Sequence, residues 1–239
     1  MFWNNWLARM ASWITTGDHL RSATLQASLQ RLRSLVKYSS LIAIGSGRGN
    51  DVLLFQRFWP GSYALLIDLD VRFQQVWEQL NRKDPNIRGV VCAAGADDGN
   101  GYFRKGNDVG GYLDSEGKAA DVQATPIKKI DTLIREFNMP GPYFLKFDTH
   151  GVELDVLAGC TETLKNTALI MIEVYNFKLK FVSGKNLTFD EMSLHMKSLG
   201  FRCIGICDPL YRPGDNVLWQ FHMFFVRDDH PVWKRSGFS

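Results

Sequence analysis

The segment FLKFDTHGVELDVLAG contains the side chains best suited to acid–base chemistry. Asp148 ends an apolar run that is typical of a buried strand, and His150 follows it in the next loop. Because open α/β sheets bind ligands at the carboxyl ends of their strands, we expect both side chains at a binding edge. A histidine titrates near neutral pH and can accept a proton from a hydroxyl group. Asp148 could orient that base, act as the base itself or hold an ammonium group of a ligand. The structural alternatives are a helix N-cap for Asp148 and a hydrogen-bond donor for His150.

A further carboxylate, Glu173, ends the apolar run ALIMIEV and is expected at the same edge. We therefore predict Asp148, His150 and Glu173 as candidate catalytic residues, with Glu173 touching either the substrate or the loop network. Glu153 falls in the first turn of the helix after Asp148, where a negative charge stabilises the helix dipole. These side chains do not form a convincing metal cage, so no metal ligands are predicted, and assistance by a divalent cation is an alternative that the sequence does not require.

The sequence IAIGSGRGND places three glycines between an apolar strand and the start of a helix. Glycine there permits a tight turn and lets a ligand approach the backbone closely. The helix N-terminus adds unpaired N–H groups. A glycine trio is also compatible with a plain tight turn, so it needs a second feature beside it. The residues predicted to bind a cofactor in this loop are Gly45, Ser46, Gly47 and Gly49.

The second feature is Asp68, which ends the following apolar run about 20 positions after the glycine loop. A carboxylate in that place can accept two hydrogen bonds from the vicinal hydroxyls of a ribose. Asp70 is a near competitor, and Asp68 ranks first because it lies nearer the strand end. Leu69 could lie against an adenine ring or pack in the core.

Strand-like and helix-like segments alternate from residue 41 onward, which is typical of a mainly parallel sheet with helices on both faces. The stretch from Gly95 to about Ala120 is rich in glycine and charge and is predicted as loops with short strands. The predicted strands are LIAIGS, SYALLID, NIRGVVCAA, PYFLKFD and ALIMIEV. The predicted helices are Asn50 to Phe58, VRFQQVWEQL, KKIDTLIREF, VELDVLAGCTETL and LTFDEMSLHMKSLG.

The last two strand-like segments, FRCIGICD and NVLWQFHMFFVR, are separated by a turn that is too short for a helix. We therefore expect them to pair antiparallel. The result is an α/β fold of the Rossmann-like class I methyltransferase type, a mostly parallel seven-stranded sheet with an antiparallel last strand. A dinucleotide-binding domain would instead close with a parallel strand, and its G-x-G-x-x-G spacing differs from G-x-G-x-G here. The expected cofactor is S-adenosylmethionine (SAM), with NAD as the alternative.

Residues 1–40 stand apart as a predicted helical extension to a cofactor-binding domain at 41–239. The segment FWNNWLARMASWI places aromatic and aliphatic side chains on one helical face, and basic residues accompany it. Such a helix could lie on an anionic membrane surface. The alternative is that it caps the core or contacts a partner subunit, as in a homo-oligomer.

Composition narrows the class of protein. A formal net charge of only +3 over 239 residues gives no dense basic face, so no nucleic-acid partner is expected. No stretch reaches the roughly 18–20 apolar residues of a spanning helix, and the N-terminus lacks the features of a signal peptide. Four cysteines are too few for a disulfide scaffold, so we expect a cytoplasmic location, with peripheral membrane contact as an alternative. Cys203 and Cys207 lie in an apolar strand without further ligands at tight spacing, and are predicted core residues.

Over residues 41–227 the sequence resembles the FkbM family of SAM-dependent methyltransferases. The most specific part is the block of Lys146, Asp148, Gly151 and Glu153, together with Asp131 in the preceding helix. The other matching segments are IGSGRGND, LID, CAAGADDGNGYF, LIMIEVYNF and WQFHMFFVR.

The resemblance implies a Rossmann-like core, SAM as methyl donor and O-methylation of a hydroxyl on a saccharide or other small molecule. It also implies that Ala94 lies near the adenine. Three positions depart from the family pattern: Ala43 replaces an acid that steadies the loop, and His150 and His222 could reflect an altered acceptor site.

The sequence thus leads to one main hypothesis, a SAM-dependent O-methyltransferase acting on a small molecule or saccharide. The enzymatic alternative is an NAD-dependent oxidoreductase. A third hypothesis is a catalytically silent SAM-fold module that assembles with a partner through its N-terminal helix.

Overall fold

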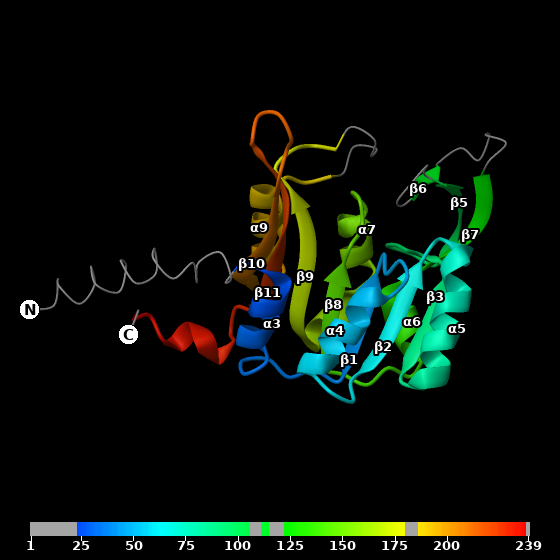
Figure 1. Ribbon diagram of the computed structural model, residues 1–239, viewed down its shortest axis with the longest axis horizontal. Helices are drawn as coiled ribbons and strands as arrows, with labels where there is room; N and C mark the ends of the chain where they lie inside the picture. Colours follow the sequence, from blue (N-terminus) through cyan, green and yellow to red (C-terminus); the bar gives the residue numbers. More distant parts are fainter. Residues whose placement is uncertain (1–22, 106–110, 115–121, 180–185, 238–239) are drawn as a thin grey trace, which may run out of the picture.

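The computed structural model describes residues 23–105, 111–114, 122–179 and 186–237. A seven-stranded sheet with the order β10-β11-β9-β8-β1-β2-β3 forms the centre of these residues (Figure 1). Its strands are β1 (Ser40–Ile44), β2 (Tyr63–Asp68), β3 (Ile87–Val91), β8 (Tyr143–Phe147), β9 (Thr167–Tyr175), β10 (Phe201–Tyr211) and β11 (Leu218–Arg227). The helices are α3 (Leu25–Leu32), α4 (Asn50–Phe58), α5 (Gln74–Lys83), α6 (Ile130–Glu136), α7 (Glu153–Ala158), α8 (Thr161–Lys165) and α9 (Phe189–Ser198), with short 3-10 turns at Val71–Phe73 and Pro231–Lys234.

The pairing of the strands confirms the expected fold class. β1 runs parallel to both β2 and β8, and parallel pairing continues outward from β2 to β3 and from β8 to β9. β11 lies antiparallel between β9 and β10. The chain therefore closes its sheet with the antiparallel hairpin that the short turn predicts, as in the Rossmann-like fold of class I methyltransferases.

Two hydrophobic cores lie on the two faces of this sheet. One core joins the sheet to α6, α7, α8 and α9. The other joins it to α3, α4 and α5, with Leu29, Phe55 and Trp77 as its largest helical contributions. The strands of the middle of the sheet are apolar on both faces because helices cover both, which is why their sequences read as continuous apolar runs.

A second sheet, of four short strands, follows β3 along the chain. Its order is β4-β7-β5-β6, with bounds β4 (Ala93–Ala94), β5 (Gly99–Lys105), β6 (Gly111–Asp114) and β7 (Val122–Lys128). Loops with short strands were expected from Gly95 to Ala120, and β5 and β6 lie in this stretch, with β5 pairing antiparallel with both β6 and β7. Glycine and charged residues hide the alternation of these strands in the sequence.

One predicted helix is divided in two. VELDVLAGCTETL forms α7 and α8 with Gly159 between them. A Cβ at Gly159 would lie 2.1 Å from the carbonyl oxygen of Gly95, so the backbone of the second sheet approaches the chain at this point. That long-range approach ends α7, and no local pattern in the sequence signals it.

Asp131 explains the start of α8. Its carboxylate accepts hydrogen bonds from the backbone N–H groups of Glu162 and Thr163 and from the hydroxyls of Thr161 and Thr163. The Asp131 side chain is buried, and burial alone would raise its pKa, but these hydrogen bonds outweigh burial and hold the pKa below its usual value. The acid that the family resemblance singled out is therefore a structural cap.

Asp131→Ala is expected to lower the free energy of unfolding by roughly 3 kcal/mol, because it leaves buried donors unpaired. Thermal melting should then fall by roughly 6–12 °C for a chain of this size. The contribution of Asp131 is present above its unfolded pKa near 3.9 and disappears as the pH falls through its lower folded pKa. Wild-type and variant should thus converge in stability under strongly acidic conditions. Asp98→Ala is the matched control: it removes an exposed cap of Lys129 and Thr132 and should cost only about 1 kcal/mol.

The predicted N-terminal extension is described only from residue 23. In this part, α3 packs against the sheet through Leu29 and Leu32, and Trp59 donates a hydrogen bond to the carbonyl oxygen of Val36. The aromatic segment at residues 2–14 lies outside the described residues. No helix among the described residues is long and apolar enough to cross a membrane.

Candidate functional site

The glycine loop between β1 and α4 has a backbone that only glycine adopts easily. Gly45, Gly47 and Gly49 have φ angles of +73°, +52° and +76°. A Cβ at Gly45 would lie 2.0 Å from the carbonyl oxygen of Asp148, and one at Gly49 would lie 2.8 Å from a methyl carbon of Leu66. A Cβ at Gly47 would meet no described atom within 4 Å. The first and third glycines therefore allow close packing, and the second faces open space.

This contrast gives a paired prediction. Gly45→Ala should lower the free energy of unfolding by about 3 kcal/mol or more, because the clash with the Asp148 backbone adds to the cost of a left-handed alanine. Gly47→Ala carries only the backbone cost of about 1–2 kcal/mol. Denaturant unfolding of both variants measures the difference. Equal free energies of unfolding for the two variants would show that Gly45 is not in close contact with the backbone at the end of β8.

The carboxylate of Asp68 faces this loop from the end of β2. Its Oδ2 accepts a 2.8 Å hydrogen bond from the Gly47 N–H, and its Oδ1 accepts one of 3.0 Å from the Asp70 N–H. A carboxylate has about four acceptor positions, so each oxygen keeps capacity for a ligand. Burial raises the pKa of Asp68. The structure thus brings together the two features that the sequence paired by spacing alone.

Asp70, the alternative to Asp68, is paired with Arg72. Its carboxylate accepts hydrogen bonds from the backbone N–H and the guanidinium of Arg72. This pair caps the short 3-10 turn at Val71–Phe73. The geometry therefore favours Asp68 as the acid that faces the loop.

The surroundings of the loop contain one residue that sequence reasoning missed. Trp77 of α5 donates a 2.9 Å hydrogen bond from its indole N–H to the carbonyl oxygen of Gly47. Leu69 is partly buried beside Asp68, and Ala94 is buried in the core on the α6 side of the sheet. Their contact with an adenine stays a prediction.

A row of polar side chains crosses the sheet just beyond the loop. Glu173 and His222 are partners in the β9–β11 pairing, and His222 and Cys207 are partners in the β11–β10 pairing. Asp148 follows the end of β8, and its backbone N–H donates to the carbonyl oxygen of Ile44. The polar row therefore lies at the C-terminal edge of the parallel strands, where the sequence placed its candidate catalytic residues.

Asp148 belongs to an ion-pair network around the buried Lys146. Its Oδ2 lies 2.7 Å from the Nζ of Lys146, which also lies 3.0 Å from a carboxylate oxygen of Asp51 in α4. Lys146 is only 3% exposed. Burial alone would raise the pKa of Asp148, but the Lys146 charge outweighs it and the pKa is lowered. An acid with a lowered pKa is a weak base, so the geometry disfavours Asp148 as the proton acceptor.

His150 is part of a separate relay. Its Nδ1 lies 2.8 Å from the hydroxyl oxygen of Tyr175, and that hydroxyl donates a 2.7 Å hydrogen bond to Oε2 of Glu173. Oε1 of Glu173 accepts a 2.6 Å hydrogen bond from Gln220. Burial, and then the Glu173 carboxylate, raise the pKa of Tyr175, so its hydroxyl keeps its proton. The structure thus brings His150 and Glu173 together through Tyr175.

Glu153 has the structural role that its position suggests. Its carboxylate accepts hydrogen bonds from the Gly151 N–H and from the Thr149 hydroxyl. It therefore closes the loop that carries His150. Burial raises the pKa of Glu153.

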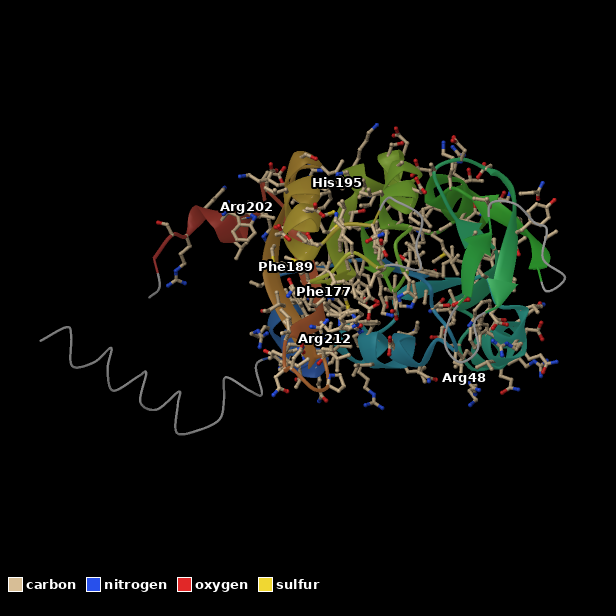
Figure 2. The ribbon with its side chains drawn as sticks, turned by 90° about the horizontal axis from the view of Figure 1, so that it is seen from above. Arg48, Phe177, Phe189, His195, Arg202 and Arg212 are labelled. Atoms are coloured by element: carbon tan, nitrogen blue, oxygen red, sulfur yellow. The ribbon has the colours of Figure 1, made fainter. Side chains whose placement is uncertain are left out.

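Aromatic side chains line the edge of the site next to the relay. The ring of Trp219 lies edge-on to Tyr175 with centroids 6.2 Å apart, and it stacks on Phe177 at 5.3 Å. The guanidinium of Arg212 lies 4.8 Å above the ring of Phe177, and both residues are labelled close together in Figure 2. Trp219, Phe177 and Arg212 are partly buried. We call Tyr175, Trp219 and Phe177 the aromatic wall.

Sequence reasoning missed this wall and most of the hydrogen-bond partners. Tyr175 and Gln220 belong to strands that pair only in the folded chain, so no local pattern in the sequence indicates that they meet.

Both β10 cysteines pack against a hydrophobic core, as predicted, but on opposite faces of the sheet. Cys203 packs on the α6 side of the sheet, whereas Cys207 is buried on the α3 side. The β10–β11 register shifts between Cys203 and Gly205, so a bulge separates two residues that a regular strand would place on one face. Asp208 and His222 come within reach of the Cys207 sulfur, a grouping that the spacing of ligand-type residues in the sequence did not indicate.

A family comparison agrees with this geometry. The family described as "Methyltransferase FkbM domain" matches residues 79–203, which is just over half of the chain. The matched segment contains Asp148, His150 and Glu173, and it begins after the glycine loop and Asp68. No curated protein sequence matches the chain closely enough to count as a relative.

Solved structures with a similar fold include three methyltransferases. The first is the 1,6-didemethyltoxoflavin-N1-methyltransferase of Burkholderia thailandensis with bound 1,6-didemethyltoxoflavin and S-adenosylhomocysteine, at 13% identity over 93% of this chain and 87% of that chain, with a TM-score of 0.46. A SAM-dependent methyltransferase from Aquifex aeolicus has 12% identity over 86% and 91% of the two chains and a TM-score of 0.44. A geranyl diphosphate methyltransferase in complex with SAM has 13% identity over 84% and 85% and a TM-score of 0.49.

Proposed function

The chain belongs to the FkbM family of SAM-dependent methyltransferases, and we propose that its acceptor atom is the oxygen of a hydroxyl group on a saccharide or other small molecule. The observation that carries this proposal is the relay of His150, Tyr175 and Glu173 at the C-terminal edge of the sheet. A hydroxyl group must lose a proton when it is methylated, and the relay supplies a positioned base.

The glycine loop fits the cofactor of this family. Gly47 faces open space beside the Asp68 carboxylate. The hydroxyl oxygen of Ser46 is enclosed and has no hydrogen-bond partner among the described residues, so the loop holds a polar group that a ligand can satisfy. When bound, SAM supplies an activated methyl group on its sulfonium. Asp68 would hold the ribose hydroxyls, and Gly45, Ser46, Gly47 and Gly49 would line the loop against the rest of the cofactor.

The relay determines which nitrogen of His150 is basic. Because the Tyr175 hydroxyl donates to Glu173, its oxygen accepts from the Nδ1–H of His150. The neutral ring then carries its lone pair on Nε2. In catalytic relays a second group commonly fixes the tautomer of the base, and a third group holds the second in place. Tyr175 and Glu173 have these two positions relative to His150. In the proposed reaction, Nε2 of His150 accepts the proton of the acceptor hydroxyl.

Asp148 serves a different purpose in this proposal. It is ionised, held by Lys146, and lies directly against the glycine loop through its backbone contact at Gly45. Of the three roles that the sequence left open, binding of the cofactor's ammonium group fits best. Lys146 and Asp51 keep this carboxylate in place.

The aromatic wall supports a saccharide or another ring-shaped acceptor. Binding sites for small molecules combine aromatic surfaces with a few polar groups that fix orientation. Trp219, supported by Phe177, offers a ring that can pack against the apolar face of a sugar, and Gln220 and Arg212 lie beside it for the hydroxyls of the sugar.

Transfer of a labelled methyl group from SAM tests the proposal. The purified chain would be incubated with glycosides that offer free hydroxyls and, in parallel, with amine and thiol analogues of the same size. We expect label on a hydroxyl oxygen. Label on nitrogen or sulfur alone would overturn O-methylation while leaving the methyltransferase assignment. SAM binding without transfer to any of these acceptor classes would favour the silent module.

A further inference from the structure

Three side chains with different donor atoms meet at the end of the polar row. Cys207 and Asp208 come from β10 and His222 comes from β11, and their potential ligand atoms all lie within 4.8 Å of one another. Cys207 is fully buried, His222 is partly buried and Asp208 is exposed. The cluster therefore extends from the core to the surface.

The convergence results from an irregularity in β10. In a regular strand, neighbouring side chains point to opposite faces, so Cys207 and Asp208 would diverge. Here the β10–β11 register shifts between Cys207 and Leu210, and Asp208 has a φ of +50°. A bulge redirects a side chain in this way and is often found beside functional sites. The left-handed Asp208 thus turns its carboxylate toward the same place as the Cys207 sulfur.

The hydrogen bonds around the cluster leave donor atoms for a ligand. The Nδ1 of His222 is enclosed and has no hydrogen-bond partner among the described residues. Buried polar nitrogens are rarely left unpaired, so this atom requires an explanation. Oδ1 of Asp208 accepts a 3.0 Å hydrogen bond from the Leu25 N–H, which fixes the carboxylate at the start of α3, and the Cys207 thiol is in hydrogen-bond contact with the same carboxylate. A carboxylate has about four acceptor positions, so these two contacts leave room for a ligand.

From this geometry we propose that Cys207, Asp208 and His222 form a binding site for a zinc ion. Zinc is bound by thiolate sulfur, imidazole nitrogen and carboxylate oxygen, usually with four ligands in a tetrahedron. Magnesium and calcium take oxygen ligands, so the sulfur and nitrogen donors select against them. Three protein ligands leave one coordination position for water.

The zinc site is separate from the methyl-transfer machinery. His222 is the strand partner of Glu173, so the ion lies on the same sheet face as the His150 relay, but none of its three ligands belongs to that relay. The site instead joins β10, β11 and, through Asp208, the beginning of α3. Metal binding is therefore measurable without any methyl acceptor, and the proposal stands or falls independently of the O-methylation proposal.

The test is titration of the chelator-treated full chain with zinc chloride, followed by measurement of bound metal. We expect one zinc per chain, displaced by a competing chelator. Cys207→Ser and His222→Ala should each weaken binding by more than about 100-fold, since even outer-shell partners of metal sites contribute 10–100-fold. Asp208→Asn, at an exposed position, should weaken binding while keeping the amide oxygen as acceptor for Leu25.

Cys203→Ser is the matched control, because Cys203 lies on the same strand but packs on the opposite face of the sheet. It should bind zinc like the wild type. Cobalt substitution adds a spectroscopic signature: a thiolate-to-cobalt charge-transfer band that is present in the wild type and in Cys203→Ser and absent in Cys207→Ser. Circular dichroism of each variant without metal shows whether it is folded, and the exposed Asp208→Asn provides the result if a core variant is not.

Two outcomes would overturn the proposal. One is a wild-type chain that takes up no zinc at concentrations where folded zinc sites saturate. The other is zinc binding that persists unchanged in folded Cys207→Ser and Asp208→Asn, which would assign the metal to other residues.

Discussion

His150→Ala is expected to lower kcat for methyl transfer by about 10²–10⁴-fold, the usual contribution of a positioned general base. In the proposed reaction, Nε2 of His150 accepts the hydroxyl proton, because the hydrogen bond to Tyr175 fixes the proton of the ring on Nδ1. The loss is therefore expected in kcat, while the affinity for SAM stays at the wild-type value. Steady-state kinetics with labelled SAM measures the first quantity, and calorimetry without acceptor measures the second.

Two further variants separate a catalytic His150 from a structural one. Tyr175→Phe keeps the ring but removes the hydroxyl that joins His150 to Glu173, and should lower kcat by roughly 10–100-fold with little change in KM. His195→Ala removes a histidine of α9, the helix on the opposite face of the sheet, and should leave kcat unchanged. Wild-type kcat in a folded His150→Ala variant would remove the base from the mechanism.

Asp68→Ala weakens SAM binding by about 10- to 150-fold, which corresponds to about 1.5–3 kcal/mol for hydrogen bonds to a charged group. The carboxylate faces the glycine loop, and each of its oxygens accepts one backbone N–H while keeping capacity for a ribose hydroxyl. Asp70→Ala is the matched control, because that acid is paired with Arg72 and should affect SAM affinity much less. An effect of Asp70→Ala larger than that of Asp68→Ala would reverse the assignment.

The same carboxylate makes SAM binding sensitive to acid. Burial raises the pKa of Asp68 above its ordinary value of 3.8, so the group gains a proton at a higher pH than an exposed aspartate does. The protonated form accepts fewer hydrogen bonds. SAM affinity should therefore fall as the pH is lowered toward that raised pKa, and Asp68→Ala should show a flatter pH dependence than the wild type.

The sequence was a good guide to the sheet because apolar runs and their spacing are local properties. The five parallel strands, the helices between them and the antiparallel end of the sheet all follow from periodicity and from the length of the last turn. The pairing of the glycine loop with Asp68 could also be predicted, since a strand–turn–helix unit with an acid after the next strand has a characteristic spacing.

The parts that could not be predicted depend on contacts between distant segments. The break at Gly159 arises from the backbone of Gly95, and the relay requires Tyr175 and Gln220 to meet across two strands. The bulge in β10 moves Cys207 to the sheet face opposite Cys203. The alternation of apolar and polar residues along a strand does not show where a bulge inserts an extra residue. Each of these features depends on which distant residues come together in the folded chain, and a single sequence does not reveal that.

Asp131 shows the opposite limitation. The family resemblance selected it as one of the most specific residues, which suggested a role in function. Its carboxylate instead binds the first turn of α8 through four hydrogen bonds. A residue that a family pattern requires can thus be required by the fold rather than by the reaction.

Isothermal titration of the purified chain with S-adenosylhomocysteine and, separately, with NADH tests the assignment most directly. We predict saturable heat with S-adenosylhomocysteine at one site per chain, weakened in Asp68→Ala, and no saturable heat with NADH. Binding of NADH together with the absence of any heat from S-adenosylhomocysteine would contradict the claim that the glycine loop and Asp68 hold the methyl donor.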